Sequence, residues 1–323
     1  MIEQHAFEGQ MYIQEVELPE GVASIKAEAF ESCQALRRIV LPEGLTRICA
    51  DAFRCCISLE GLELPSTLKE LGEHAVTDTY GWSPSMNGIA YMRVHPDNPC
   101  FYHDANAFYQ RRENGSLLIK YFGKNEVWKI PEEVTELGAM ALRRANLREV
   151  VIPETVKSIS KDAFAECGRL ECMEFAADGV KLYVPENPVY RKGEISSLFY
   201  RDNAGQLHYD YETYDSLLAD WSQILIRCRM AAFRLEYPVQ LPAARKQAYE
   251  ALIAEHLKDL VYDICKRDSL KDLAALGNAG MITAEHIEEM IDWTTACHRG
   301  KLTGYLLEYQ QEHFTENTFD FSL

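Results

Sequence analysis

Hydrophobic side chains in the first 80 positions of the chain recur with a fixed period of 23 residues. Three features keep this phase: an Ala-Phe pair, a Leu-Pro pair and an aliphatic residue seven positions after the leucine. They occur at Ala6-Phe7, Ala29-Phe30 and Ala52-Phe53, with Ala75-Val76 as a divergent copy, at Leu18-Pro19, Leu41-Pro42 and Leu64-Pro65, and at Ile25, Ile48 and Leu71. One such unit cannot bury its apolar side alone, but stacked neighbours can, so the period predicts a solenoid.

The same pattern resumes further along the chain. It returns as Ile130-Pro131 and Ile152-Pro153, as Leu137 and Ile159, and as Ala141-Leu142 and Ala163-Phe164. Within one unit, the spacing of Leu36, Ile39 and Leu41 favours a short strand that ends at the proline, which lacks a backbone donor. We predict compact repeats over residues 1–79 and 127–175, each with this strand and a second short extended segment.

Residues 80–126 lack the compact pattern and predict a β-hairpin. Asn114-Gly115 lies between the β-forming runs 107–109 and 117–119. Asn-Gly is a strong signal for a two-residue turn, because both turn positions need a positive φ. A related block returns 89 residues later, at 185–190, 198–200, 203–205 and 207–209. We predict hairpin-containing units over residues 80–126 and 176–213, and we expect the second to cap the array.

Toward the C-terminus the hydrophobic period becomes helical. Residues 216–236 predict one helix, and residues 243–264 place their apolar side chains on one helical stripe. Ser269 is a suitable N-cap for a short helix that follows. The predicted fold class is therefore α+β: a repeat solenoid in residues 1–213, with short strands and hairpin insertions, followed by an all-α helical domain in residues 214–323.

The repeat unit reads A-F-x-x-C-x-x-L-x-x-I-x-L-P-x-x-L-x-x-I, as in residues 52–71. With this motif, residues 1 to roughly 210 resemble the BspA-type, or Treponema pallidum-type, leucine-rich repeats of bacteria. The resemblance implies adhesion or host-surface binding for secreted members. It also extends to the hairpin blocks, which look like the longer unit found in such arrays. Residues 270–314 are only loosely similar to ankyrin-type or other α-solenoid hairpins, because the T-P-L-H turn signature is missing.

Composition and charge narrow the possible functions. The net charge of −17 argues against nucleic-acid binding, which needs clustered Lys and Arg. No apolar run is long enough for membrane insertion, and the N-terminus lacks a signal-peptide pattern. Cys33, Cys56 and Cys167 share one repeat position and predict buried structural thiols, which suit a reducing compartment. We predict a cytoplasmic bacterial protein, with an exported or cell-surface location as the alternative if the sequence is part of a longer chain.

Candidate chemistry is sparse. No nucleotide-binding, zinc-protease or serine-hydrolase motif occurs. Cys100 and His103 have the spacing of a metal-ligand pair, but no second pair is close in sequence. Cys297-His298 could suggest a nucleophile, but no orienting partner is identifiable. We therefore expect no catalysis, no cofactor and no metal.

The strand positions that face away from the core form the candidate binding site. If Leu36 and Ile39 point inward, Arg38 and Val40 point outward, and the other repeats place mainly acidic residues in register. The face consists of Glu15, Glu17, Arg38, Val40, Glu63, Glu149, Val151 and Glu174. It predicts a protein partner that is basic or of mixed charge. A solvated face that keeps the chain soluble is the alternative interpretation.

We therefore expect a protein–protein interaction scaffold that uses this strand face. One alternative is an exported or surface adhesin that binds a host or matrix protein. Another is a regulatory or enzymatic helical domain that uses the solenoid as a substrate reader. The latter would need a pocket in residues 214–323, lined by convergent polar groups with perturbed pKa values. The sequence leaves the oligomeric state open.

Overall fold

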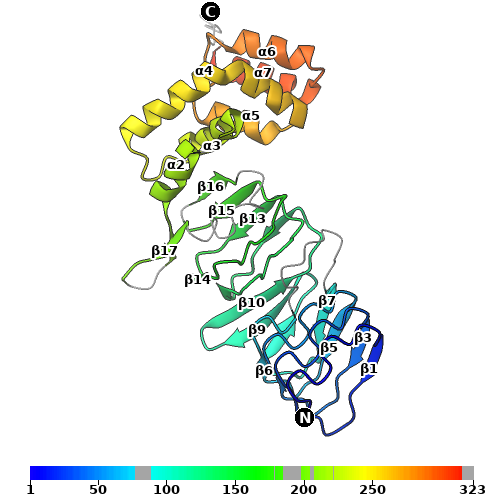
Figure 1. Cartoon of the computed structure of the whole chain (residues 1–323). Coiled ribbons are helices and arrows are strands. Elements are labelled where there is room, and N and C mark those ends of the chain that lie inside the picture. Colours follow the sequence, from blue (N-terminus) through cyan, green and yellow to red (C-terminus); the bar gives the residue numbers. More distant parts are fainter. Residues whose placement is uncertain (77–88, 178, 185–197, 204–206, 221, 315–323) are drawn as a thin grey trace, which may run out of the picture. The chain divides into compact units, whose positions relative to one another are not determined.

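A computed structural model describes residues 1–76, 89–177, 179–184, 198–203, 207–220 and 222–314. The chain forms two compact units, Met1–Arg169 with Asn187–His208, and Leu170–Glu186 with Tyr209–Leu323. The first holds the repeats and the second holds the helices (Figure 1). The predicted boundary after residue 213 stays a prediction. Parts of both predicted hairpin units, residues 80–88, 185–197 and 204–206, lie outside the described residues.

The first repeats form two rows of short parallel strands. One row contains β1 (Glu15–Glu17) paired with β3 (Arg38–Val40), and β5 (Gly61–Leu64) paired with β7 (Tyr91–Val94). The other row is a three-stranded sheet of β2 (Ser24–Ile25), β4 (Arg47–Ile48) and β6 (Glu70–Leu71). Each repeat therefore supplies one strand to each row, as its alternating apolar positions predict.

The core between these rows consists of ladders of equivalent side chains. The rings of Phe7, Phe30 and Phe53 stack with centroid separations of 5.0 and 5.5 Å. The buried thiols of Cys33 and Cys56 each donate to a backbone carbonyl of the preceding coil, at 3.0 Å. Each residue of the ladder therefore packs on its own copy, and the prediction of buried structural thiols at this position is confirmed.

In the first repeats, a left-handed residue precedes each Ala-Phe pair and the divergent pair Ala75-Val76. His5, Glu28, Asp51 and His74 have φ angles of 58°, 59°, 54° and 55°. The backbone turns sharply at each of these positions, and the amide groups that follow bond the next coil, as in the 2.9 Å hydrogen bond from Phe30 N to Ala52 O. Because non-glycine residues adopt this conformation at a cost, its repetition shows that the stacking of coils determines the turn.

The predicted hairpin insertion is present. β8 (Phe101–His103), β9 (Ala107–Arg112) and β10 (Gly115–Tyr121) form an antiparallel meander, and β10 continues in parallel into the strands β12 (Val134–Leu137) and β14 (Ser158–Ile159). β11 (Val127–Lys129) pairs with β13 (Glu149–Ile152).

The turn of this hairpin lies one residue earlier than predicted. Gly115 pairs with Arg112, so the two turn residues are Glu113 and Asn114. Gly115 has a φ of 136°, and a Cβ there would collide with Thr135 and the carbonyl of Glu133. The glycine therefore serves the close approach of the next coil, and not the hairpin turn itself.

The second unit begins with an antiparallel strand pair, β15 (Cys172–Phe175) and β16 (Val180–Tyr183). The short strands β17 (Phe199–Arg201) and β18 (Leu207–Tyr209) pair with each other and precede the helices in the chain, and their residues up to His208 belong to the first unit. The described helices are α2 (Tyr211–Asp220), α3 (Ile224–Glu236), α4 (Ala243–Arg267), α5 (Leu270–Asn278), α6 (Ile287–Ala296) and α7 (Gly300–His313). The predicted fold class, a solenoid of short strands followed by a helical region, is confirmed.

One predicted helix is in fact two. The segment 216–236 contains the end of α2 and all of α3, because the chain leaves the helical conformation before Gln223, the residue that precedes α3. α2 also begins earlier than predicted, because the Asp210 carboxylate accepts hydrogen bonds from the backbone N–H and the hydroxyl of Thr213. The N-cap prediction at Ser269 is confirmed, since its hydroxyl accepts from the N–H of Asp272.

A buried ion pair joins the first helices of this unit. Arg234 of α3 is fully buried, and its Nε donates to Asp215 Oδ1 of α2 at 3.0 Å. The hydroxyl of Tyr249 in α4 donates to the same carboxylate oxygen at 2.9 Å. The other guanidinium nitrogens donate to the carbonyl oxygens of Tyr237 and Val239, both at 2.8 Å. The charge of Arg234 is therefore fully coordinated by protein groups.

Candidate functional site

The predicted strand face begins with charged side chains on neighbouring strands. The register pairs Glu15 with Arg38 and Glu17 with Val40. Both glutamates and Arg38 are exposed, Val40 is half-buried, and Ile39 between them is buried. Opposite charges therefore lie side by side at this end of the array.

The face continues with a cluster that combines an aromatic ring and two charges. The register aligns Gly61 with Tyr91 and Glu63 with Arg93. The Tyr91 ring covers Gly61 so closely that a Cβ at that position would collide with it. The Arg93 guanidinium lies 5.0 Å from the centre of the ring and 3.7 Å from Glu63 Oε1. Tyr91 keeps 39% of its surface exposed, so the cluster presents an accessible, ordered aromatic group.

Sequence analysis identified Glu63 but missed Tyr91 and Arg93. These two residues follow the break in the 23-residue period, since Tyr91 comes 30 positions after Gly61. The available signal was the alternation in Tyr91–Val94, where the first and third residues are exposed and the others are buried. A shallow hollow of about 350 Å³ adjoins the cluster, and its lining includes Glu43, Glu63, Arg93 and His95.

The later repeats present a different face. β13 carries Glu149 and Val151, which are both half-buried. Their partners in register are Val127, which is 57% exposed, and Lys129, which lies 2.9 Å from Glu132. This part of the face therefore combines Lys129 and two apolar side chains, Val127 and Val151, with Glu149.

The last predicted site residue, Glu174, belongs to the helical unit. It is half-buried in β15 and forms an ion pair of 2.7 Å with Lys181 of β16. Cys172, two positions before Glu174 on the same strand, is fully buried. The other predicted site residues lie in the first unit. The structure thus gathers Glu15, Glu17, Arg38, Val40 and Glu63 on the strands of the first coils.

The candidate chemical residues make structural contacts. His103 Nδ1 accepts a hydrogen bond from the backbone N–H of Val94 at 3.3 Å. Among the described residues, no group of three or more His, Cys, Asp or Glu side chains could hold a metal ion. Burial and a hydrogen bond to Cys297 raise the pKa of Cys265 to about 11, which keeps that thiol protonated at neutral pH.

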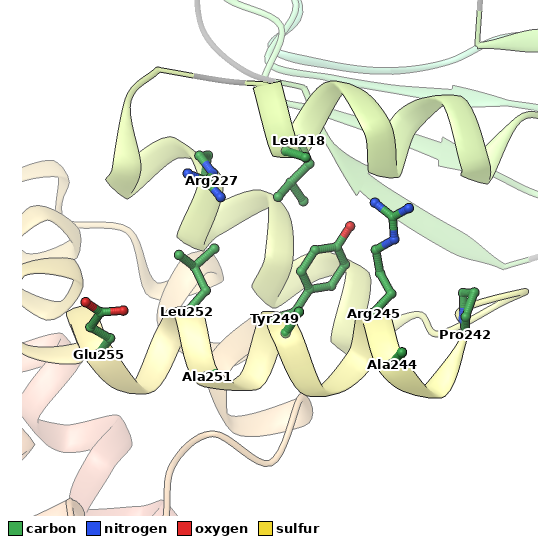
Figure 2. A pocket seen from close by; sticks show the side chains of 11 residues that line it. Leu218, Arg227, Pro242, Ala244, Arg245, Tyr249, Ala251, Leu252 and Glu255 are labelled. Atoms are coloured by element: carbon green, nitrogen blue, oxygen red, sulfur yellow. The ribbon is translucent and has the colours of Figure 1, made fainter.

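A separate groove runs along α4 in the helical unit (Figure 2). It has a volume of about 640 Å³ and is lined mainly by alanine and leucine side chains, with Arg227, Arg245, Tyr249 and Glu255 as its polar residues. Burial and the nearby Asp215 carboxylate both raise the pKa of Tyr249 above its ordinary value. Tyr249 therefore stays protonated at neutral pH.

The comparisons with known proteins identify the repeats. Residues 1–81 and 120–185 match the family model of the BspA type leucine rich repeat region, in six copies. These two matched segments therefore carry BspA-type leucine-rich repeats. The search of curated proteins gave no match.

Two solved bacterial structures resemble part of the chain. A leucine rich cell surface protein from Faecalibacterium prausnitzii is 26% identical, with a TM-score of 0.46, over 54% of this chain and 44% of its own. The pneumococcal vaccine antigen PcpA is 24% identical, with a TM-score of 0.42, over 50% of this chain and 39% of its own. The chain thus spans less than half the length of either protein. No described helix combines the length and the apolar character needed to span a membrane.

Proposed function

We propose that the protein is a non-catalytic binding protein, and that the strand face of its first repeats holds a protein partner of mixed charge. The observation that supports this proposal is the cluster of Tyr91, Arg93 and Glu63 on neighbouring strands, with the ring held in place over Gly61. Tyrosine and arginine contribute most to binding energy when a rigid scaffold holds them, because little side-chain entropy is lost on binding.

The charges on the strands of the first repeats favour a partner that carries both signs. Glu15 and Glu17 are exposed on β1, whereas Arg38 and Arg93 are basic groups on β3 and β7. The partner would place basic residues against the glutamates and acidic residues against the arginines. Alternating charges across an interface influence the orientation of the partner and the association rate more than they influence the affinity.

The experiment compares two sets of glutamate reversals. The first replaces the exposed face residues Glu15, Glu17 and Glu63 of the first repeats by Lys, and the control replaces Glu3, Glu20 and Glu113, which are exposed outside the strands. Both sets change the net charge equally. Wild type and control should retain one specific protein in affinity capture, and the face variant should lose it at unchanged thermal stability. Equal capture by all three would contradict the proposal.

The ring and the basic group of the cluster are tested separately. Tyr91→Ala and Arg93→Ala should each weaken the captured complex by roughly tenfold or more, as expected for residues at the centre of an interface. Tyr12, which is 93% exposed outside the strands, provides the matched control Tyr12→Ala. If the control weakens binding as much as Tyr91→Ala, the partner binds elsewhere.

The cellular location remains part of the proposal. The comparisons give no support to the predicted cytoplasmic location, and one similar solved protein is described as a cell surface protein. Capture is therefore carried out both from lysate and from an extract of host or matrix proteins. A partner from lysate supports an internal scaffold, and a partner from the extract supports an exported adhesin. An enzymatic helical region remains an alternative that no described constellation favours.

A further inference from the structure

The groove along α4 has an apolar floor of small side chains. Ala244, Ala248 and Ala251 lie on the exposed side of this helix, and Leu218 and Ala219 of α2 line the same groove. Figure 2 shows Leu218 pointing from α2 toward α4. Small side chains on an exposed helix allow another backbone to come close, so the groove can accept a helix laid along α4.

Two arginines line this groove without an acidic partner. Among the described residues, neither Arg227 nor Arg245 forms an ion pair. Arg227 Nε is buried and has no hydrogen-bond partner. Arg245 donates from Nη1 to the backbone oxygen of Asp215 at 2.9 Å, which leaves its charge unneutralised. A buried donor without an acceptor costs free energy, which an incoming carboxylate would recover.

Buried arginines elsewhere in the unit differ in their pairing. Arg299 Nε also has no hydrogen-bond partner, and Arg229 Nε and Nη1 have none, although Arg229 Nε lies 3.8 Å from Asp263. Arg234 pairs with Asp215, and Arg267 lies 3.2 Å from Asp263. The whole chain carries 50 acidic and 33 basic side chains, so acidic partners for arginine are plentiful. Arg227 and Arg245 differ from these residues because both line one apolar groove, whose complement would therefore be negatively charged.

We propose that this groove binds an acidic amphipathic helix of a protein partner. The apolar face of that helix would contact Ala248, Ala251 and Leu218, and two carboxylates on its flanks would reach Arg245 and Arg227. Arginine suits this role because its planar guanidinium can bind a carboxylate through two parallel hydrogen bonds. The contact is separate from the strand face of the repeats and does not depend on it.

Glu255 gives one end of the groove a negative charge, so the two ends of the groove differ. In Figure 2, Arg245, Tyr249 and Leu252 follow one another along α4, with Glu255 beyond them and Arg227 above Leu252. A partner helix would therefore present an acidic residue, an apolar pair, a second acidic residue and then a basic one. Reversing that order would set a carboxylate against Glu255 and weaken the complex.

The test uses the full chain and a fluorescein-labelled helical peptide, capped at both ends, in which two glutamates flank a leucine pair and a lysine follows. Fluorescence anisotropy should show saturable binding that weakens as salt increases. Arg227→Glu should weaken binding at least about tenfold, and Arg227→Lys should retain part of it. Lys301→Glu, an equal charge reversal at an exposed site on α7, should leave binding unchanged.

A second variant tests the apolar floor. Ala248→Trp should fill the groove and abolish binding, while circular dichroism confirms that the exposed substitution leaves the helices intact. The proposal is overturned if the peptide does not bind, if Arg227→Glu binds as well as wild type, or if a peptide with lysines in place of the glutamates binds equally well. The proposal is also overturned if the protein binds dodecanoate but none of the peptides. The groove would then be assigned to a fatty acid. None of these outcomes bears on capture through the strand face.

Discussion

The two units of the chain are stabilised in opposite ways. In the repeats, core contacts recur from coil to coil: the rings of Phe7, Phe30 and Phe53 stack in one ladder, and the thiols of Cys33 and Cys56 each donate to the preceding coil. In the helical unit, the pair of Arg234 and Asp215 occurs once and sits at full burial. The difference teaches that an array distributes its stability over many equivalent contacts, whereas the helical unit depends on a few groups that have no substitute.

The largest effect is expected from removing the partner of the buried guanidinium. Asp215→Ala should destabilise the helical unit by about 4–5 kcal/mol, because Arg234 is left buried without a counter-charge. Urea denaturation followed by helical circular dichroism measures this. Asp215→Ala combined with Arg234→Leu should recover most of the loss. A loss below about 1 kcal/mol would show that the helical unit does not depend on this ion pair for its stability.

A cavity in the array should have a smaller effect that depends on position. Phe30→Ala should cost about 3–4 kcal/mol, because its ring is fully buried between Phe7 and Phe53. Phe7→Ala, at a half-buried position with a single stacked neighbour in the described residues, should cost less. Hydrogen exchange should localise the damage to the adjacent coils and spare β13. Uniform loss of hydrogen-exchange protection across all coils would contradict the inference that the stability of the array is distributed over many equivalent contacts.

Matched cysteines offer a finer comparison of the two units. Cys167 donates to Leu142 O at 2.9 Å, whereas the Cys228 thiol lies 3.9 Å from Leu252 O. Both are buried. Cys167→Ala should therefore cost about 1–2 kcal/mol, and Cys228→Ala should cost less by roughly the value of one hydrogen bond, about 1 kcal/mol. Equal losses in thermal melts would show that burial alone determines the contribution of these thiols.

The smallest effect should be opposite pH dependences of the two units. Burial opposes ionisation of Glu166, but hydrogen bonds from Arg143 and Arg144 outweigh it and lower its pKa. Burial raises the pKa of Asp272, although Arg229 opposes this. Glu166 therefore adds stability above its unfolded pKa of about 4.3, which is lost as pH falls through its depressed pKa. Asp272 binds its proton more tightly when folded, so its contribution declines as pH rises above about 3.9.

This comparison is measured with neutral variants of each carboxylate. Glu166→Gln should reduce the stability of the array at neutral pH, and the difference from wild type should shrink as pH falls. Asp272→Asn should make the helical unit less sensitive to pH just above pH 4. Each slope is limited to about 1.4 kcal/mol per pH unit for a single proton. Slopes of the same sign in both units would refute this assignment.

The repeats were predictable because their information is local and copied. Leu36, Ile39 and Cys33 each mark a position that returns one coil later, and their burial follows from that register. The aromatic cluster was missed because Tyr91 reaches Gly61 across 30 residues, after the period has broken. Nothing in the local pattern aligns these two residues. The register of β5 and β7 is determined by the packing of the coils.

The helical groove was beyond sequence analysis for a related reason. Arg227 and Arg245 lie on separate helices, and the break between α2 and α3 falls inside a segment whose period predicted one continuous helix. Which side of α4 stays exposed depends on how these helices pack. Periodicity identifies an apolar stripe, but it does not say which polar residues from another helix will lie beside it.

The left-handed residue before each Ala-Phe pair of the first repeats makes this part of the array adjustable in length. Excision of residues 29–51 would place Glu28 directly before Ala52, where its φ of 59° would replace the 54° of Asp51. Duplication or loss of a whole coil therefore preserves the backbone path at the junction. Unequal recombination can lengthen or shorten this surface in steps of 23 residues, so that the span offered to a partner can evolve independently of the residues that contact it.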